Sequence, residues 1–238
     1  MACWQYFGFD VGEMKQTMFF ITGTDTGVGK TVLTALLVRY LRGRGVCAVA
    51  LKPICSGGRG DARALHTASD GILTLGEINP WHFRAPIAPL LAARCEKERV
   101  SLVGVVAHIR ALQKRFNVLL IEGAGGLLSP LGWNFNSRAL IIALHATPVV
   151  VCPNRLGAVN QILLTLEALP HSAAAKARVV FMSPSKLDSS TATNAGLLSE
   201  FFNTKKIFSL PWLGGKFDAV RSLKDPRMEQ TLRALTRV

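Results

Sequence analysis

The 238-residue sequence lacks the features that mark a disulfide-rich, zinc-clipped or membrane-spanning protein. Its five cysteines are odd in number and widely scattered, and no two of them have C-x2-C spacing, which argues against a disulfide framework or a zinc clip. No apolar run reaches the roughly 18 residues that a membrane span requires. The first residues have no basic start followed by an apolar core, as a signal peptide would. We therefore expect a cytoplasmic protein without a membrane anchor.

Recognisable nucleic-acid modules are also missing, although the formal net charge is +13. The basic residues are dispersed, and the densest groups lie at Val38–Gly45 and Asn203–Lys206. Dispersed charge is more typical of a basic surface around an anion-binding enzyme than of a nucleic-acid groove. We predict no nucleic-acid partner.

Catalytic constellations that use a protein nucleophile are absent as well. The five histidines show no metal-ligand spacing, and neither a Ser-His-Asp nor a Cys-His arrangement is apparent. No pair of carboxylates has the pattern of a glycoside hydrolase. Any chemistry must then come from groups that bind and position substrates.

Short, almost continuously apolar runs alternate with segments of helical periodicity, which predicts a doubly wound, mainly parallel α/β sheet with helices on both faces. The expected strands are Phe19–Thr22, Val46–Leu51, Val118–Ile121, Pro148–Cys152, Val179–Met182 and Ile207–Leu210. The expected helices are Lys30–Arg42, Ser101–Arg115, which Ser101 would cap, Ala158–Leu169 and Ala192–Asn203. Met18 directly precedes the first strand, so residues 1–17 are a possible dispensable extension and residues 18–238 a single domain.

A phosphate-binding loop follows the first strand in the stretch GTDTGVGKT. It nearly fits the pattern G-x4-G-K-[ST], but Gly23 lies one residue early and Thr24 occupies the expected glycine position. Strand, loop and helix nevertheless occur in the order that presents backbone N–H groups and a helix N-terminus to an anion. Lys30 is placed to reach the β- and γ-phosphates of a nucleotide, and the Thr31 hydroxyl to bind Mg²⁺.

Polar residues follow the next strands, where the ligand site of such a sheet lies. Lys52 ends the second strand, and Glu122 ends the third, where a buried carboxylate requires a cation or metal partner. Asp61 fits either an ordinary acidic helix start or a Mg²⁺ ligand. The helix start at Gly157–Asn160 offers free N–H groups to a carboxylate or phosphate, which alone is a weak signal.

Together these blocks resemble the dethiobiotin synthetase family, from about Met18 to Gly214. The similarity rests on GTDTGVGKT with its early glycine, LKPICSG, GDARAL around Asp61, FRAPIAPLLAA, IEGAGGLLSPL, RLGAVNQILLT and LPWL. It implies a Mg-ATP-dependent ligase of the P-loop type that closes a cyclic urea from 7,8-diaminononanoate and CO2 or bicarbonate. The family acts as a homodimer, so the resemblance implies a second copy as partner.

The resemblance assigns roles to individual residues. It implies that ATP is bound by Thr26, Gly27, Val28, Gly29, Lys30, Thr31, Ser183 and Pro211. It further implies that the diamine or its carbamate is bound by Ser56, Gly125, Gly157 and Asn160, and Mg²⁺ by Thr31, Asp61 and Glu122. Lys30 and Lys52 would be catalytic and neutralise the charge of the carbamate and of the transferring phosphoryl group.

Three features depart from the family pattern. Ser183 stands where the family usually has an asparagine that reads adenine, which suggests a relaxed nucleotide choice. Arg138 stands where the family has an acid, and the chain is more basic than is usual in the family. Two alternatives stay open: a related amide synthase, which would need an ammonia source, and a partitioning-type switch ATPase. The latter has a signature lysine early in its loop, whereas residues 23–28 contain none.

Overall fold

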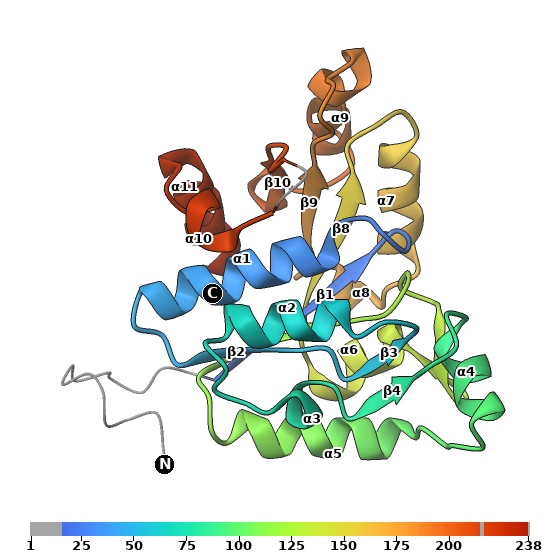
Figure 1. Ribbon diagram of the computed structural model, residues 1–238. Helices are drawn as coiled ribbons and strands as arrows, with labels where there is room; N and C mark the ends of the chain where they lie inside the picture. Colours follow the sequence, from blue (N-terminus) through green and yellow to red (C-terminus); the bar gives the residue numbers. More distant parts are fainter. Residues whose placement is uncertain (1–15, 215–216, 238) are drawn as a thin grey trace.

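A six-stranded parallel sheet organises the chain (Figure 1). The computed structural model describes residues 16–214 and 217–237. In the sheet the strands lie in the order β10-β9-β8-β1-β5-β2, and each hydrogen-bonded pair is parallel. Their bounds are β1 (Thr17–Gly23), β2 (Ala48–Leu51), β5 (Val118–Glu122), β8 (Thr147–Pro153), β9 (Arg178–Met182) and β10 (Ile207–Leu210).

The strands form here because their near-continuous apolar runs are covered on both faces. All residues of β2 and β5 are buried, and Phe20, Ile21 and Leu119 in the centre of the sheet are fully enclosed. The register pairs Phe20 of β1 with Ile121 of β5 and with Pro148 of β8. This burial on both faces is the pattern expected for a parallel sheet inside an α/β domain.

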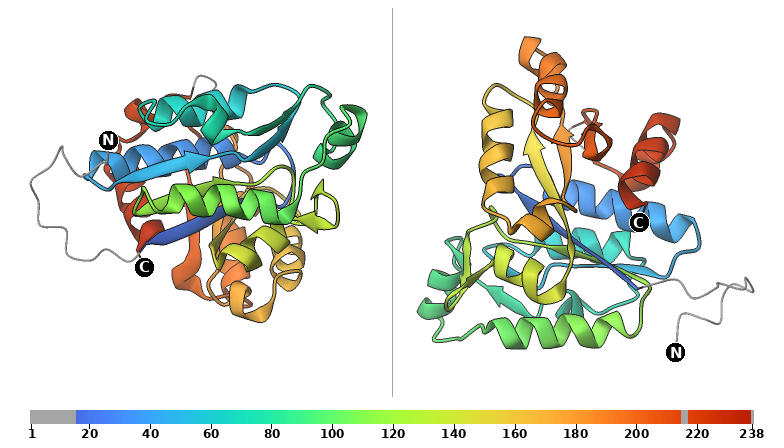
Figure 2. Two further views of the ribbon diagram at one scale, coloured as in Figure 1. Left: turned by 90° about the horizontal axis from the view of Figure 1, so that it is seen from below. Right: turned by 180° about the vertical axis from the view of Figure 1, so that it is seen from behind.

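Helices form a layer on each face of the sheet (Figures 1 and 2). One layer contains α1 (Lys30–Gly43), α2 (Gly60–Ala68), α10 (Ala219–Ser222) and α11 (Pro226–Thr236). The other contains α5 (Leu102–Gln113), α6 (Ser137–Leu144), α7 (Ala158–Glu167), α8 (His171–Ala174) and α9 (Ser189–Ser199). The predicted doubly wound architecture is therefore confirmed.

All six predicted strands are present; Ile207–Leu210 has the predicted bounds, and the other five are shifted at one or both ends. The first begins at Thr17, which pairs with Val118, and the second begins at Ala48 and not at Val46. Ser101 caps α5 as predicted, because its side chain accepts a hydrogen bond from the N–H of Gly104 at 3.1 Å.

The helix predicted at Ala192–Asn203 is present, but it begins and ends earlier in the chain than predicted. The helix spans Ser189–Ser199 because Asp188 and Thr191 form a capping box at its start. Asn203 instead caps a short 3-10 helix, Thr204–Lys206. The capping residues thus decide where this helix begins more strongly than its weak apolar periodicity does.

Several short elements lie outside the six-stranded sheet, and the sequence pattern does not predict them. They are the parallel pair β3 (Ile54–Ser56) and β4 (Trp81–Phe83), the hairpin β6 (Pro130–Gly132) and β7 (Phe135–Asn136), α3 (Leu75–Ile78) and α4 (Pro89–Cys95). These pieces are too short to show a periodicity of their own.

No helix in the described part of the chain is long and apolar enough to cross a membrane. The prediction of a dispensable extension concerns residues 1–17, of which residues 1–15 lie outside those that the structure describes. The cytoplasmic location likewise stays a prediction.

Candidate active site

The loop between β1 and α1 explains the early glycine of the phosphate-loop pattern. A Cβ atom on Gly23 would lie 2.6 Å from Cγ2 of Val28, whose side chain is buried beneath the loop. Glycine is therefore required at this position, one residue ahead of the usual one, so that Val28 can anchor the turn. The loop ends at Gly29, which caps α1 with a φ of 99°, a conformation that favours glycine.

Lys30 lies at the first position of α1 and points into this loop. Only 6% of the residue is exposed, and its Nζ donates a hydrogen bond to the carbonyl of Asp25 at 2.7 Å. Burial, together with the nearby charge of Lys52, lowers the pKa of Lys30 to about 8. Among the described residues the only hydrogen bond of this buried ammonium goes to a carbonyl of the loop, so the group is well suited to meet an incoming phosphate.

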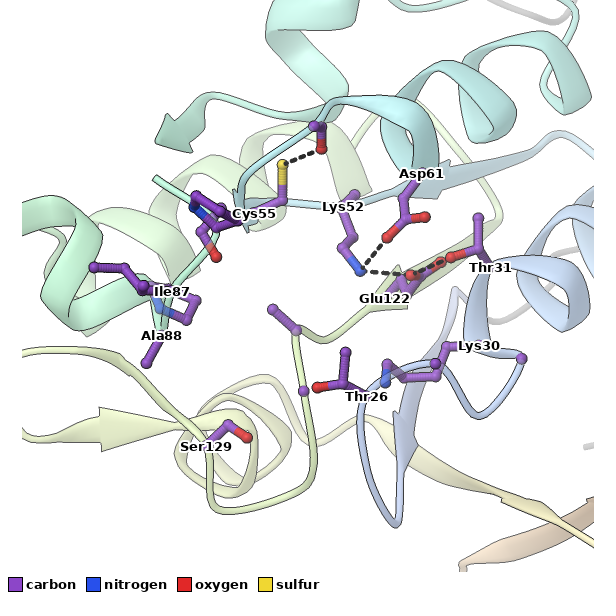
Figure 3. Close-up of a pocket in the computed structure, with 18 of the residues that line it drawn as sticks. Thr26, Lys30, Thr31, Lys52, Cys55, Asp61, Ile87, Ala88, Glu122 and Ser129 are labelled. Atoms are coloured by element: carbon purple, nitrogen blue, oxygen red, sulfur yellow. Dashed lines mark hydrogen bonds and ion pairs between the residues drawn. The ribbon is translucent and has the colours of Figure 1, made fainter. Parts of the chain in front are cut away.

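A compact charged cluster lies beside the loop, where β2 and β5 end (Figure 3). The Lys52 ammonium is 2.6 Å from Oε1 of Glu122 and 3.2 Å from Oδ2 of Asp61, and it donates to the carbonyl of Gly123 at 3.1 Å. Thr31 donates its hydroxyl to the same Glu122 oxygen at 2.8 Å. Residues from β2, α2, β5 and α1 thus converge on one point.

The electrostatics of the cluster keep Lys52 charged. Burial alone would lower its pKa, but the adjacent carboxylates of Glu122 and Asp61 outweigh this and raise it. A buried ion pair of this kind contributes little net stability, because desolvating both charges offsets most of their attraction. Its retention in the interior therefore favours a functional role.

The oxygen atoms of the cluster fit a magnesium ion in part. The second oxygen of Glu122, Oε2, is buried and has no hydrogen-bond partner within the described residues, and the Thr31 hydroxyl lies on the other oxygen. No group of three or more His, Cys, Asp and Glu side chains in the described ranges could hold a metal. Mg²⁺ is commonly bound by one or two carboxylates together with nucleotide phosphates, and this chain offers that kind of donor set.

The cluster and the loop border one cavity of about 710 Å³. Ten of the predicted site residues line it: Thr26, Gly27, Gly29, Lys30, Thr31, Lys52, Ser56, Asp61, Glu122 and Gly125. They come from segments spread over a hundred residues of chain, and the parallel sheet brings them together at its carboxyl edge.

Five predicted residues do not line this cavity. The side chain of Val28 is buried, which leaves only its backbone to meet a phosphate. Ser183 and Pro211 directly follow β9 and β10, and the Ser183 N–H donates to the carbonyl of Leu210 at 2.9 Å. Gly157 and Asn160 lie at the start of α7, with Gly157 as its cap.

Other residues that line the cavity have no role predicted from the sequence. The segment Pro86–Pro89 and Cys55 form part of its wall, opposite Ser129 (Figure 3). The only sequence signal for the segment was its membership of the block FRAPIAPLLAA. Burial raises the pKa of the Cys55 thiol, whose Sγ lies 3.4 Å from Oδ1 of Asn79, so this thiol is held protonated.

Arg138, the basic residue at a usually acidic position, lies away from the cavity. It is exposed on α6, and its guanidinium donates to the carbonyl of Ala168 at 3.3 Å. In this chain it links α6 to the end of α7.

Comparisons with known proteins agree with this geometry. Residues 17–215 match the family described as AAA domain. An ATP-dependent dethiobiotin synthetase of Anaeromyxobacter dehalogenans (strain 2CP-1 / ATCC BAA-258) is 41% identical over 198 residues, which cover 81% of this chain and 89% of the relative. The corresponding protein of Akkermansia muciniphila is 35% identical over 184 residues, covering 77% of this chain and 86% of the relative.

Among solved structures, a ParA family ATPase from Chlorobium tepidum TLS superposes with a TM-score of 0.59. The match covers 93% of this chain and 100% of the ATPase, at 11% sequence identity. At that identity the likeness shows a shared fold and nothing about activity.

Proposed function

Because the chain belongs to the dethiobiotin synthetase family and is therefore an ATP-dependent ligase, we propose that its cavity converts 7,8-diaminononanoate and carbon dioxide to dethiobiotin. The observation that supports this most directly is the cluster of Lys52, Glu122, Asp61 and Thr31 beside a phosphate loop. It places two buried ammonium groups next to a cavity large enough for a nucleotide phosphate and a small substrate.

The phosphate loop binds the triphosphate of ATP. Backbone N–H groups of residues 26–29 and the N-terminus of α1 face the anion. Lys30 exchanges its hydrogen bond with the neutral Asp25 carbonyl for one with a phosphate oxygen, in which both the donor and the acceptor are charged.

The reaction itself needs no protein nucleophile. One amine of the substrate adds to carbon dioxide and gives a carbamate, whose oxygen then attacks the γ-phosphoryl group of ATP and expels ADP. The second amine attacks the resulting carbamic-phosphoric anhydride, closes the five-membered urea and releases phosphate. Lys52 stabilises the negative charge of the carbamate, while Ser56 and Gly125 border the space in which the diamine lies.

Thr31, Asp61 and Glu122 would hold Mg²⁺, with the buried Oε2 of Glu122, which has no hydrogen-bond partner in the described part of the chain, available as a ligand. When bound, the ion neutralises phosphate charge during phosphoryl transfer. In the structure the Lys52 ammonium neutralises the carboxylates of Asp61 and Glu122. The two carboxylates are therefore already positioned around a cation.

A homodimer would complete the substrate site. Gly157 and Asn160 open α7 but do not line the cavity of their own chain, whereas a second copy could present them to the carboxylate of the substrate. The surface around this helix start fits a contact between copies, because Leu156 is 80% and Leu164 63% exposed.

One assay tests the proposal. The protein is incubated with Mg-ATP, bicarbonate and 7,8-diaminononanoate, and dethiobiotin is measured by mass. We expect product that depends on all three substrates. ATP hydrolysis that ignores the diamine, with no dethiobiotin, would contradict the proposed reaction.

A further inference from the structure

A second cavity, of about 680 Å³, borders the later residues of α4, whereas the active-site cavity borders the segment Pro86–Pro89 at the start of this helix. Its walls come from α4, from the segment that joins α4 to α5, and from the tip of the β6–β7 hairpin. None of the predicted catalytic, nucleotide, substrate or metal residues lines it. It is nearly as large as the active-site cavity and within the size range of small-molecule sites.

The inner wall of this second cavity is apolar and firmly packed. Ala93 and Val100 are buried, and Leu90 and Leu102 are partly buried. The hairpin lies directly against the joining segment, since a Cβ atom on Gly132 would be only 2.6 Å from the carbonyl oxygen of Val100. This wall can therefore hold a hydrocarbon chain or ring away from water.

The rim of the cavity is strongly basic. Arg94, Lys97 and Arg99 line it together with a single acid, Glu98, and all four residues are exposed. Within the described ranges none of these four side chains forms an ion pair or a hydrogen bond. In contrast, Arg84 before the start of α4 is paired with Glu96.

An exposed tryptophan completes the rim. Trp133, at the hairpin tip, is 67% exposed, and the guanidinium carbon of Arg94 lies 5.4 Å from its ring centroid. Stacking on the ring restricts the guanidinium while its N–H donors stay available to a ligand. A large aromatic surface and an oriented cation are thus presented side by side.

From these features we infer that the cavity is a second binding site, separate from the ATP site, for a small organic carboxylate with an apolar chain or ring. The carboxylate pairs with Arg94 and Lys97, and the apolar body lies against Val100, Leu102 and Trp133. A neutral apolar ligand would leave the cations unused, and a compact inorganic anion would leave the apolar wall exposed to water. An amphiphilic anion satisfies both parts of the cavity.

Calorimetric titration with octanoate tests the inference. We expect saturable binding of one octanoate per chain with a Kd of about 1 mM or tighter. In the variant Arg94→Gln/Lys97→Gln the Kd should weaken at least about tenfold, which corresponds to one lost charge-assisted hydrogen bond of about 1.4 kcal/mol. The matched control Lys176→Gln/Lys186→Gln removes two exposed charges elsewhere and should bind as the unmodified protein does.

Two further titrations separate this cavity from other anion sites. Lys30→Ala should bind octanoate unchanged, because Lys30 belongs to the other cavity. Octanol, which lacks the charge, should bind at least about tenfold more weakly than octanoate.

Three results would overturn the inference. They are no saturable binding, equal binding to the Arg94→Gln/Lys97→Gln variant, and loss of binding in Lys30→Ala. Binding that appears only together with a change in sedimenting mass would identify the surface as a contact between copies instead.

Discussion

The two ends of helix α1 use charged side chains in opposite ways. At its N-terminus Lys30 is 6% exposed and Thr31 contacts the buried Glu122. Near its C-terminus Arg39 and Arg42 both bind Asp70, whose side chain is 45% exposed. The same kinds of group are thus enclosed at one end and solvated at the other. The buried set is costly to keep in the interior, which agrees with the ligand-binding role proposed for it, whereas the solvated set contributes only modestly to stability.

The largest expected effect follows from removing the buried cation. Lys30→Ala should lower kcat for dethiobiotin formation by a factor on the order of 10²–10³, the usual loss when one preorganised charge-stabilising group is deleted. Circular dichroism should show that the protein remains folded, since within the described ranges the ammonium makes a single hydrogen bond, to the carbonyl of Asp25. Lys186→Ala, which removes an exposed lysine, is the control. A near-normal kcat for Lys30→Ala would mean that phosphoryl transfer occurs elsewhere.

The next effect comes from substitutions in the buried ion pair of Lys52 and Glu122, which should change the activity and the free energy of unfolding independently. Glu122→Gln leaves the Lys52 ammonium, 4% exposed, without its closest partner and should lower the free energy of unfolding by about 3 kcal/mol. Adding Lys52→Met should recover most of this stability, because the isolated charge is removed. Both variants should be inactive. Urea unfolding and the dethiobiotin assay measure the two quantities.

The partly exposed ion pair of Arg115 and Glu77 provides the control for these two variants. Arg115→Gln breaks the partly exposed ion pair with Glu77 and should cost under about 1 kcal/mol. If Lys52→Met/Glu122→Gln were as unstable as the single variant, the ion pair would be a net structural contribution and the argument for its functional retention would fail.

Much of the buried end could be predicted from the sequence because its determinants are local. Strand, glycine loop and helix follow one another in residues 17–43, and the parallel sheet brings Lys52 and Glu122 to the same edge. The early position of Gly23 is visible in the sequence, but the reason for it, the contact with Val28, depends on side-chain packing that no spacing rule contains.

The walls of the two cavities could not be predicted in the same way. α4 has seven residues, and β6 and β7 are shorter still, so none of them shows a readable period. Trp133 and Arg94 lie almost forty residues apart and meet only because the hairpin folds back onto α4. Contacts between loops of this kind are set by tertiary packing and not by local propensity.

A smaller effect is expected on the choice of nucleotide at the N-terminal end of α1. A Cβ atom on Gly29 would lie 3.1 Å from Cε of Met182, so the end of β9 adjoins the phosphate loop and Ser183 follows directly. Ser183→Asn adds an amide that can donate to and accept from adenine. We expect the preference for ATP over CTP and GTP, measured as kcat/KM, to rise roughly tenfold.

The exposed Ser185→Asn, two residues further on, is the matched control and should leave the preference unchanged. A strong ATP preference in the unmodified protein that Ser183→Asn does not alter would show that other groups read the base.

The smallest effect is expected at the solvated end of α1. Burial would raise the pKa of Asp70, but the hydrogen bond from Arg42 and the charge of Arg39 prevail and lower it. The stabilisation is therefore complete above the ordinary carboxyl pKa of about 3.9 and is lost as the pH falls through the lower folded-state pKa. Asp70→Asn should cost at most about 1 kcal/mol at pH 7, because the carboxylate is half exposed and screened by solvent.

Asparagine also tolerates the left-handed backbone of this position, where φ is 55°, so the substitution tests charge and not strain. Urea unfolding at pH 7 and at pH 3 should show a difference between the two proteins that shrinks at the lower pH. Glu200→Gln, which removes an exposed carboxylate outside any ion pair of the described chain, should show no such trend. A loss as large as that of Glu122→Gln would erase the contrast between the two ends of α1, because a solvated ion pair would then matter as much as a buried one.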